Sequence, residues 1–150
     1  MKETKKVMAR KDPYKDFRFR VEIDGIASSL FLECTGLGSE VAVIEYREGG
    51  DPTTAVRKLP GRASFSDITL KRGITESRDL YDWHRSLLQG VNDRRNGQII
   101  LLDDTGAEVV RWVFRDAWPR KWEGPDLKAT SNEVAIETFV LACESIERDA

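Results

Sequence analysis

The sequence predicts a mainly β domain, a β-barrel or sandwich of about seven or eight strands with one α-helix on its flank. Two observations carry this prediction. Short apolar segments recur along the chain with turn signals between them, such as Asp24-Gly25 and Asp104-Thr105-Gly106. One segment, residues 77–89, places apolar side chains at helical spacing. The length of 150 residues suits one domain whose core needs neither disulfides nor a metal.

The first strands are predicted from alternation. Residues 17–23 alternate between apolar and charged side chains, which is typical of a half-buried strand. Asp24-Gly25 is expected to form a hairpin turn, and residues 29–34 a second strand. The third predicted strand covers residues 41–47. It is apolar on both faces at its start, so that residues 41–46 could supply surface for a contact with a partner.

Turn residues divide the following segment. Residues 56–59 are predicted to be extended and to end in a Pro60-Gly61 turn, because Pro presets φ and Gly accepts unusual φ values. Residues 64–71 form the next predicted strand, with Ile68 and Leu70 near its centre.

The helix is predicted over residues 77–89. Ser77 is expected to be its N-cap, and Asp79 and Asp82 lie in the first turns, where the helix dipole favours negative charge. Gly90 is a suitable residue just beyond its C-terminus. The apolar stripe that would face the core consists of Leu80, Trp83 and Leu87, and Leu88 could extend it.

A hairpin and a final strand are predicted in the last third of the chain. Residues 98–103 and 109–116 form the hairpin, and Pro119 is expected to break the second strand because it cannot donate to a ladder. Residues 121–125 are expected to form an irregular edge. The last strand covers residues 133–143, and both of its faces become apolar toward its end, so that one can fill the core while the other meets a partner.

The residues that catalysis would need are not grouped in the sequence. His84 is the single histidine, and Cys34 and Cys143 lie far apart, so a tetrahedral zinc site is not expected. Asp103-Asp104 lies at a predicted hairpin tip, where Asp is common for turn reasons. Gly36-Leu37-Gly38 lacks the remainder of a phosphate-binding loop. We therefore expect no enzyme activity, no cofactor and no metal.

Charge is unevenly distributed along the chain. Residues 1–20 contain eight Lys/Arg and three Asp/Glu, and the rest contains sixteen and twenty-three. Residues 1–12 are thus expected to form a basic arm on an acidic body, residues 13–147. The arm could bind nucleic acid, dock onto an acidic neighbouring copy, or remain a solvated tail. No apolar run approaches the roughly 20 residues that span a bilayer, and no secretory signal is expected.

Turn residues concentrate between Tyr46 and Gly73, which indicates a segment built for shape.

An ordered set of short motifs extends from about Asp12 to Ile146 and resembles the phage-like tail tube family, which includes the inner tube proteins of extracellular contractile injection systems. The likeness is to the tubes of headless, toxin-delivering particles more than to those of long-tailed phages. The motifs are residues 45–52, 59–61, 68–74, 94–97, 117–119, 121–125 and 133–137, together with Trp83.

This resemblance implies a tail-tube-type β-barrel or sandwich and a structural role. It implies hexameric rings that stack into a hollow tube inside a contractile sheath, on a baseplate and spike, with protein cargo in the lumen. It also implies assembly in the bacterial cytoplasm, release in an extracellular particle or virion tail, and no specific nucleic-acid recognition.

The resemblance further implies that a loop near residues 49–56 reaches neighbouring subunits or the adjoining ring. The candidate contact residues are Glu48, Gly49, Gly50, Asp51, Pro52, Thr53 and Thr54. Valine at both Gly49 and Gly50 is expected to impair assembly more than folding, since β-branched residues resist the positive φ expected of these glycines.

Two alternatives stay open at this point. The chain could be a tube initiator or another baseplate-proximal tube-like component, which copy number per particle would distinguish. It could also be a small-molecule-binding β-barrel, which would need an apolar interior cavity.

Overall fold

The structure, a computed structural model, describes residues 12–15, 18–29, 31–47, 49–50, 55–130 and 132–149. Ten strands and one helix lie within these residues, which confirms the predicted mainly β class with a flanking helix. They are β1 (Phe19–Ile23), β2 (Ile26–Ser29), β3 (Glu33–Thr35), β4 (Ser39–Tyr46), β5 (Arg57–Phe65), β6 (Ile68–Gly73), α2 (Asp79–Leu88), β7 (Arg95–Leu102), β8 (Glu108–Glu123), β9 (Ile136–Ala142) and β10 (Ser145–Arg148).

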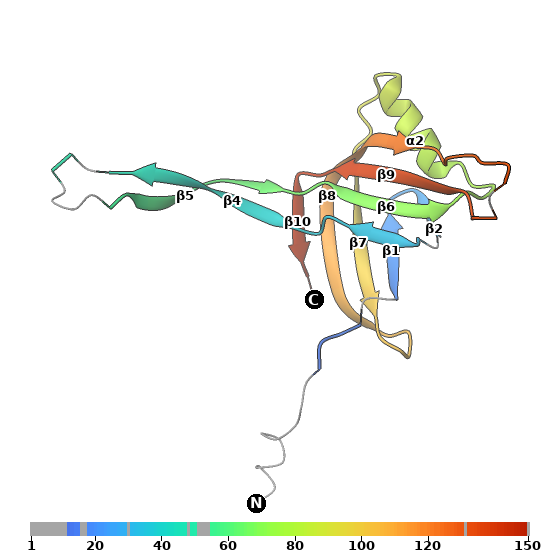
Figure 1. The fold of residues 1–150 in the computed structure, drawn as a ribbon, viewed down its shortest axis with the longest axis horizontal. Helices are drawn as coiled ribbons and strands as arrows, with labels where there is room; N and C mark the ends of the chain where they lie inside the picture. The colour runs from blue at the N-terminus through green and yellow to red at the C-terminus, as the bar shows by residue number, and fades with distance from the viewer. Residues whose placement is uncertain are drawn as a thin grey trace, which may run out of the picture.

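Eight strands form one antiparallel sheet that is folded over at β8. Its order is β2-β1-β7-β8-β9-β6-β3, and β10 pairs with β8 beside this path. The first part of β8 pairs with β7, up to Ala117, and the second part, from Trp118, pairs with β9. In Figure 1 the two parts of the sheet run in different directions, with α2 above them. Within the described residues the pairing path ends at β2 and β3, so the sheet is not a closed barrel.

The bend in β8 is built at Asp116. This residue has φ of 53°, the one positive value among the described non-glycine residues, and its backbone N–H donates to Oδ1 of Asn96 at 3.0 Å. An Asp tolerates the left-handed region better than most residues. The ladder with β7 does end at Ala117, but the strand is not broken as predicted, because β8 turns at Asp116 and continues through Pro119 by pairing with β9.

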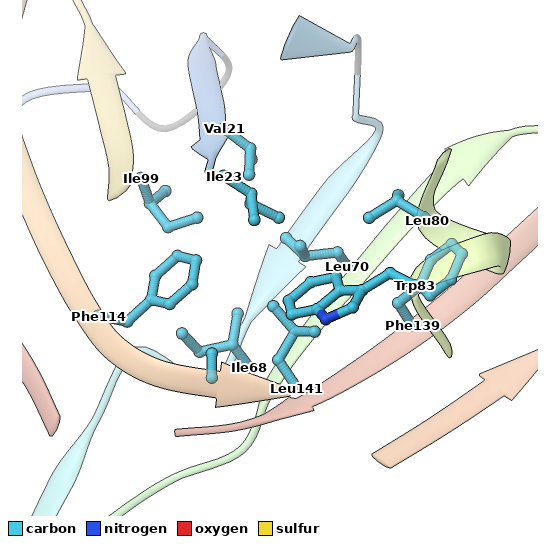
Figure 2. Packing of buried hydrophobic residues seen from close by; sticks show 11 residues of the cluster. Val21, Ile23, Ile68, Leu70, Leu80, Trp83, Ile99, Phe114, Phe139 and Leu141 are labelled. Atoms are coloured by element: carbon cyan, nitrogen blue, oxygen red, sulfur yellow. The ribbon is translucent and has the colours of Figure 1, made fainter. Parts of the chain in front are cut away.

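The core lies between the two parts of the sheet and under the helix. Figure 2 shows Phe114 and Ile99 facing Ile68 and Leu141 across it. Leu80 and Trp83 of α2 enter the same cluster and are 0% and 1% exposed, as the predicted apolar stripe requires. Leu88 does not extend that stripe, because it is 71% exposed. The core thus joins both parts of the sheet to the helix, in the manner of a sandwich.

Pro60 and Gly61 do not form the predicted turn. They lie inside β5, where the register shifts by one residue: Val41 is paired with Ala63, and Val43 with Pro60. This shift is a β-bulge, and Pro is compatible with a bulge in a two-stranded ribbon because its missing N–H costs no central ladder bond.

Three other strand predictions differ from the structure. The strand expected over residues 29–34 is divided between β2 and β3, and the one expected over 64–71 is divided between β5 and β6. Residues 121–123, expected to be irregular, continue β8. β10 follows Cys143 and was not predicted, since its four residues carry little apolar alternation.

The predicted N-cap of the helix is wrong, and its C-terminus is confirmed. Arg78 is the N-cap and makes no side-chain capping bond. The Asp79 carboxylate instead accepts from the Leu80 N–H at 2.8 Å. At the other end Gly90 has φ of 86°, and Val91 donates its N–H to Ser86 O at 3.0 Å, which is a Schellman closure.

A buried ion pair attaches α2 to the sheet. Arg72, which is 2% exposed, donates from Nε to Glu137 at 2.7 Å and from Nη2 to Asp79 at 3.2 Å. Trp122 donates from Nε1 to the second oxygen of Glu137 at 3.2 Å. Burial raises the pKa of Asp79, but hydrogen bonds from Ser77, Leu80 and Arg72 outweigh it and hold that pKa below its usual value. These contacts join β6, β8 and β9 to the start of the helix.

We predict that Gly97→Ala destabilises the fold. A methyl group at Gly97 would lie 2.6 Å from the carbonyl oxygen of Glu22 and would also collide with the Phe114 ring. Overpacking of this kind costs about 2 kcal/mol of unfolding free energy or more, because backbone and core must both move. Urea denaturation followed by circular dichroism measures the loss.

Gly49→Ala is the matched control for this measurement. Nothing lies within 4 Å of the position its Cβ would take, and its φ is outside the left-handed region. Equal midpoints for the two variants would contradict the packing argument.

Candidate functional site

The feature that the core does not explain is a two-stranded ribbon formed by β4 and β5. These strands pair with one another and form a sheet separate from that of the body. In Figure 1 the ribbon projects from the body along the longest axis of the molecule. Every residue of β4 is exposed.

Apolar side chains occupy both faces of this ribbon. Val41 and Val43 point to one face, beside Ala63 and Pro60, and Ile44 points to the other, beside Leu59. Exposed fractions reach 54% for Val41, 62% for Val43 and 52% for Ile44. A two-stranded hairpin is marginally stable in water by itself, and contiguous exposed apolar surface marks an interaction site. The ribbon therefore has the composition of a contact surface on each face.

The base of the ribbon is held in a fixed direction. Gly36 has φ of 91° and lies so close to the carbonyl of Asp67 that a Cβ could not fit. Ser66 donates its N–H to Gly38 O at 3.0 Å, and Arg120 on β8 donates to the Asp67 carboxylate at 2.8 Å. The Gly36-Leu37-Gly38 segment thus brings the two stems of the ribbon together, and its glycines serve close backbone packing rather than phosphate binding.

The predicted contact loop lies at the far end of the ribbon, and the structure describes two of its residues. Gly49 and Gly50 form an exposed turn. Neither has φ in the left-handed region, and nothing lies within 4 Å of either Cβ position. The expectation of positive φ at these glycines is therefore wrong, and with it the stated reason for the valine substitutions. Glu48, Asp51, Pro52, Thr53 and Thr54 lie outside the described residues, as do residues 1–11 of the basic arm.

The two strands of the ribbon carry exposed apolar residues, and residues 41–46 are those whose pattern indicated a possible contact surface. Their double-faced apolar pattern was visible in residues 41–47. That pattern is equally typical of a strand buried within a sheet, so the sequence did not separate the two possibilities.

The described residues with possible chemical roles serve the fold. Asp103 accepts from the Thr105 hydroxyl at 2.6 Å and from the Ala107 N–H at 2.9 Å, and these bonds lower the pKa of its carboxyl while they close the hairpin. His84 Nδ1 lies 2.8 Å from Pro119 O. Burial raises the pKa of Cys34 to about 12, and burial and the charge of Asp67 raise that of Cys143 to about 11, so both thiols are weak nucleophiles.

The described residues contain no group of three or more His, Cys, Asp or Glu side chains placed to hold a metal ion. Their helix lacks the length and hydrophobicity needed to cross a membrane. The aromatic side chains of Trp112 and Trp122 pack against the core, as their positions on β8 predict.

Comparison with known proteins gives one family and a consistent set of solved structures. Residues 15–147 match the model of the family described as T4-like virus tail tube protein gp19. No curated protein sequence matches significantly.

Three solved structures illustrate the structural similarity. A chain of the PVC sheath/tube terminator of an extracellular contractile injection system, in the extended state, is 28% identical with a TM-score of 0.85; the match covers 95% of this chain and 100% of that one. A chain of the PVC sheath-tube complex is 28% identical with a TM-score of 0.82 and 92% coverage of each. Hcp1 from Flavobacterium johnsoniae shares the fold, with 18% identity, a TM-score of 0.59, and coverage of 87% of this chain and 94% of that one.

We predict that charge on either face of the ribbon blocks self-association but leaves the monomer folded. Val43→Lys and Ile44→Lys alter opposite faces at exposed positions, so each should change the unfolding free energy of the monomer by no more than about 0.5 kcal/mol. Burying an unpaired ammonium group in an apolar contact is costly, so assembly should fall sharply for both. Sedimentation velocity at increasing concentration measures it.

Leu88→Lys is the control, because Leu88 is 71% exposed and lies on α2, not on the ribbon. If the Val43→Lys or the Ile44→Lys chain associates normally, the face that carries the substitution is not part of the contact surface.

Proposed function

This chain belongs to the family of the T4-like virus tail tube protein gp19, and we propose that it is the repeating inner tube subunit of a contractile injection system or phage tail. Its subunits would form hexameric rings that stack into a hollow conduit, which sheath contraction drives into a target cell. The family resemblance found in the sequence is confirmed by the match over residues 15–147. The role that we propose is structural.

The ribbon is the observation that carries this proposal. The ribbon projects from the body, and both of its faces expose apolar side chains. Exposed apolar surface of this kind marks a site of interaction with another molecule. A heterologous contact closes into a ring when its rotation permits, and a second such contact stacks rings into a filament. Obligate interfaces of this kind bury about 2,000–5,000 Å² and are apolar at their centres. The ribbon supplies apolar surface for contacts of both types.

The partners and setting follow from the same proposal. The tube subunit would contact a sheath protein along its outside and baseplate and spike proteins at its first ring, with protein cargo in its lumen. Support comes from the similarity to a chain in the PVC sheath-tube complex. Assembly would take place in the bacterial cytoplasm before release in an extracellular particle or virion tail. We also propose that residues 13–147 form one domain that follows the basic arm.

Negative-stain electron microscopy of the purified chain tests the proposal. We expect rings with sixfold symmetry, and at higher concentration tubes with a central channel. A chain that stays monomeric at high concentration, and that is missing from particles isolated from its source, would contradict the proposal.

Copy number separates the repeating subunit from the alternative role of a tube initiator. A tube subunit should be present in many copies per particle, because each stacked ring adds six. Quantitative mass spectrometry of isolated particles measures the ratio of this chain to the spike protein. A ratio corresponding to a single ring would favour an initiator or another baseplate-proximal component.

A further inference from the structure

Residues 94–97 form one of the motifs that carry the family resemblance, and the proposed function gives them no role. In the structure they lead into β7, of which Asn96 is the second residue. Asn96 Oδ1 accepts the backbone N–H of Asp116 at 3.0 Å, so this side chain supports the bend of β8. The motif ends in Gly97. Asparagine is a thermolabile residue, and it loses its amide most readily when glycine follows it.

Packing fixes glycine at position 97. A Cβ there would collide with the Phe114 ring and would lie 2.6 Å from the carbonyl oxygen of Glu22. The residue after Asn96 therefore cannot carry a side chain without a shift of core and backbone. Because Gly97 has no side chain, nothing shields its backbone nitrogen from the side-chain carbonyl carbon of Asn96.

The chain contains two other asparagines, which serve as internal references. Asn92 is followed by Asp93 and Asn132 by Glu133, so a side chain crowds the next peptide nitrogen in both cases. All three asparagines are exposed. Access of water is therefore similar at the three positions, and Asn96 differs in the glycine that follows it and in its contact with the bend.

The hydrogen bond from Asp116 has a chemical consequence as well as a structural one. A backbone N–H that donates to a carbonyl oxygen stabilises the negative charge that develops on this oxygen during nucleophilic attack on its carbon. The Asp116 N–H lies in hydrogen-bond contact with Asn96 Oδ1, which is the oxygen that would take up this charge. The bend therefore holds the amide of Asn96 as an activated electrophile.

The backbone nitrogen of Gly97 reaches this amide when the beginning of β7 opens. The register between β7 and β8 shifts between Arg95 and Gly97, so Asn96 lies at a β-bulge, where the ladder is locally disrupted. It also lies one residue from the end of the strand. Segments of this kind open at a small fraction of the global unfolding free energy, so the nucleophile gains access without unfolding of the body.

We propose that Asn96 is a site of spontaneous deamidation in the folded chain. The Gly97 nitrogen attacks Cγ of Asn96, and the new N–C bond closes a succinimide ring. The Cγ–Nδ2 bond breaks, and Nδ2 leaves as ammonia with the proton from the Gly97 nitrogen. A water molecule then opens the ring at either carbonyl and gives aspartate or isoaspartate. The net reaction consumes water and releases ammonia, and it needs no oxidant or cofactor.

Both products change the bend. Aspartate keeps an acceptor for the Asp116 N–H but adds a carboxylate next to that residue's own. Isoaspartate routes the main chain through Cγ of residue 96, which adds one atom to the backbone at the β-bulge and displaces the acceptor. β8 continues from the bend to Arg120, which binds Asp67 at the base of the ribbon. Formation of isoaspartate therefore loosens the part of the sheet that fixes the direction of the ribbon.

The experiment is peptide mapping of the purified full chain after incubation in mildly alkaline buffer made with heavy-oxygen water. Mass spectrometry identifies conversion by the exchange of NH2 for OH with uptake of heavy oxygen, and chromatography separates the aspartate and isoaspartate peptides. We expect about tenfold more conversion at Asn96 than at Asn92 or Asn132, which corresponds to an activation barrier lower by about 1.4 kcal/mol.

Two variants serve as controls. Asn96→Gln keeps an amide but needs a larger ring for the same attack, so we expect no conversion at residue 96 in this chain. Asn96→Asp has the charge of the product with an unaltered main chain. Urea denaturation compares it with the isolated isoaspartate chain, and we expect the isoaspartate chain to unfold at the lower urea concentration.

Each outcome has a defined meaning. If Asn96 stays unmodified in the folded chain while the same chain unfolded in urea converts, the strand protects the residue and the proposed site is wrong. Equal conversion at Asn96, Asn92 and Asn132 would also overturn it, because the glycine and the bend would then have no effect. Equal urea midpoints for the isoaspartate chain and Asn96→Asp would overturn the effect on the bend. The reaction takes place within a single chain, so none of these results bears on the tube role.

Discussion

The constraint on which the rest of this structure depends is that the hydrophobic core is complete without the ribbon. Among the described residues, the core cluster comes from β1 and from β6 onward, with partly buried side chains added from the segment before β4. No member of that cluster lies in β4 or β5. The body can therefore fold around Phe114, Phe139 and Trp83 while the ribbon keeps its apolar residues available for another molecule.

That separation has an energetic consequence. Burial of a side chain such as Val or Leu is worth about 1.5–3 kcal/mol, and the ribbon leaves much of this free energy unused in the single chain. Association with neighbouring copies buries these side chains and gains that free energy, so the ribbon is more stable in an assembly than in the single chain. The same exposure makes such a chain prone to non-specific pairing. The β5 bulge and the basic residues Arg57, Lys58 and Arg62 limit that hazard, because both features disfavour edge-to-edge pairing between identical strands.

The direction of the ribbon is as important as its composition. A flexible arm would lose conformational entropy on docking and would bind weakly, whereas an arm held in its binding orientation loses less. The close packing of Gly36 on Asp67, the bond from Arg120 to Asp67, and the bend at Asp116 all act within the same region of the sheet. Arg72 on β6 holds the start of the helix through Asp79, and it also pairs with Glu137 on β9. A buried ion pair adds little net stability, but its geometry favours one arrangement of the partners.

The sequence by itself determined the mainly β class, the helix, the β7–β8 hairpin and the family. These rest on local patterns: alternation, helical spacing, and turn residues whose φ preferences act within a few positions. The tertiary structure decided where strands change neighbours. Pro60-Gly61 and Pro119 predicted interruptions, but pairing across the chain kept β5 and β8 continuous because a bulge or a new partner supplied what each proline removed. The tertiary structure also decided that residues 41–47 project from the body. A pattern that is apolar on both faces predicts burial, but it does not distinguish burial within the same chain from burial against another copy.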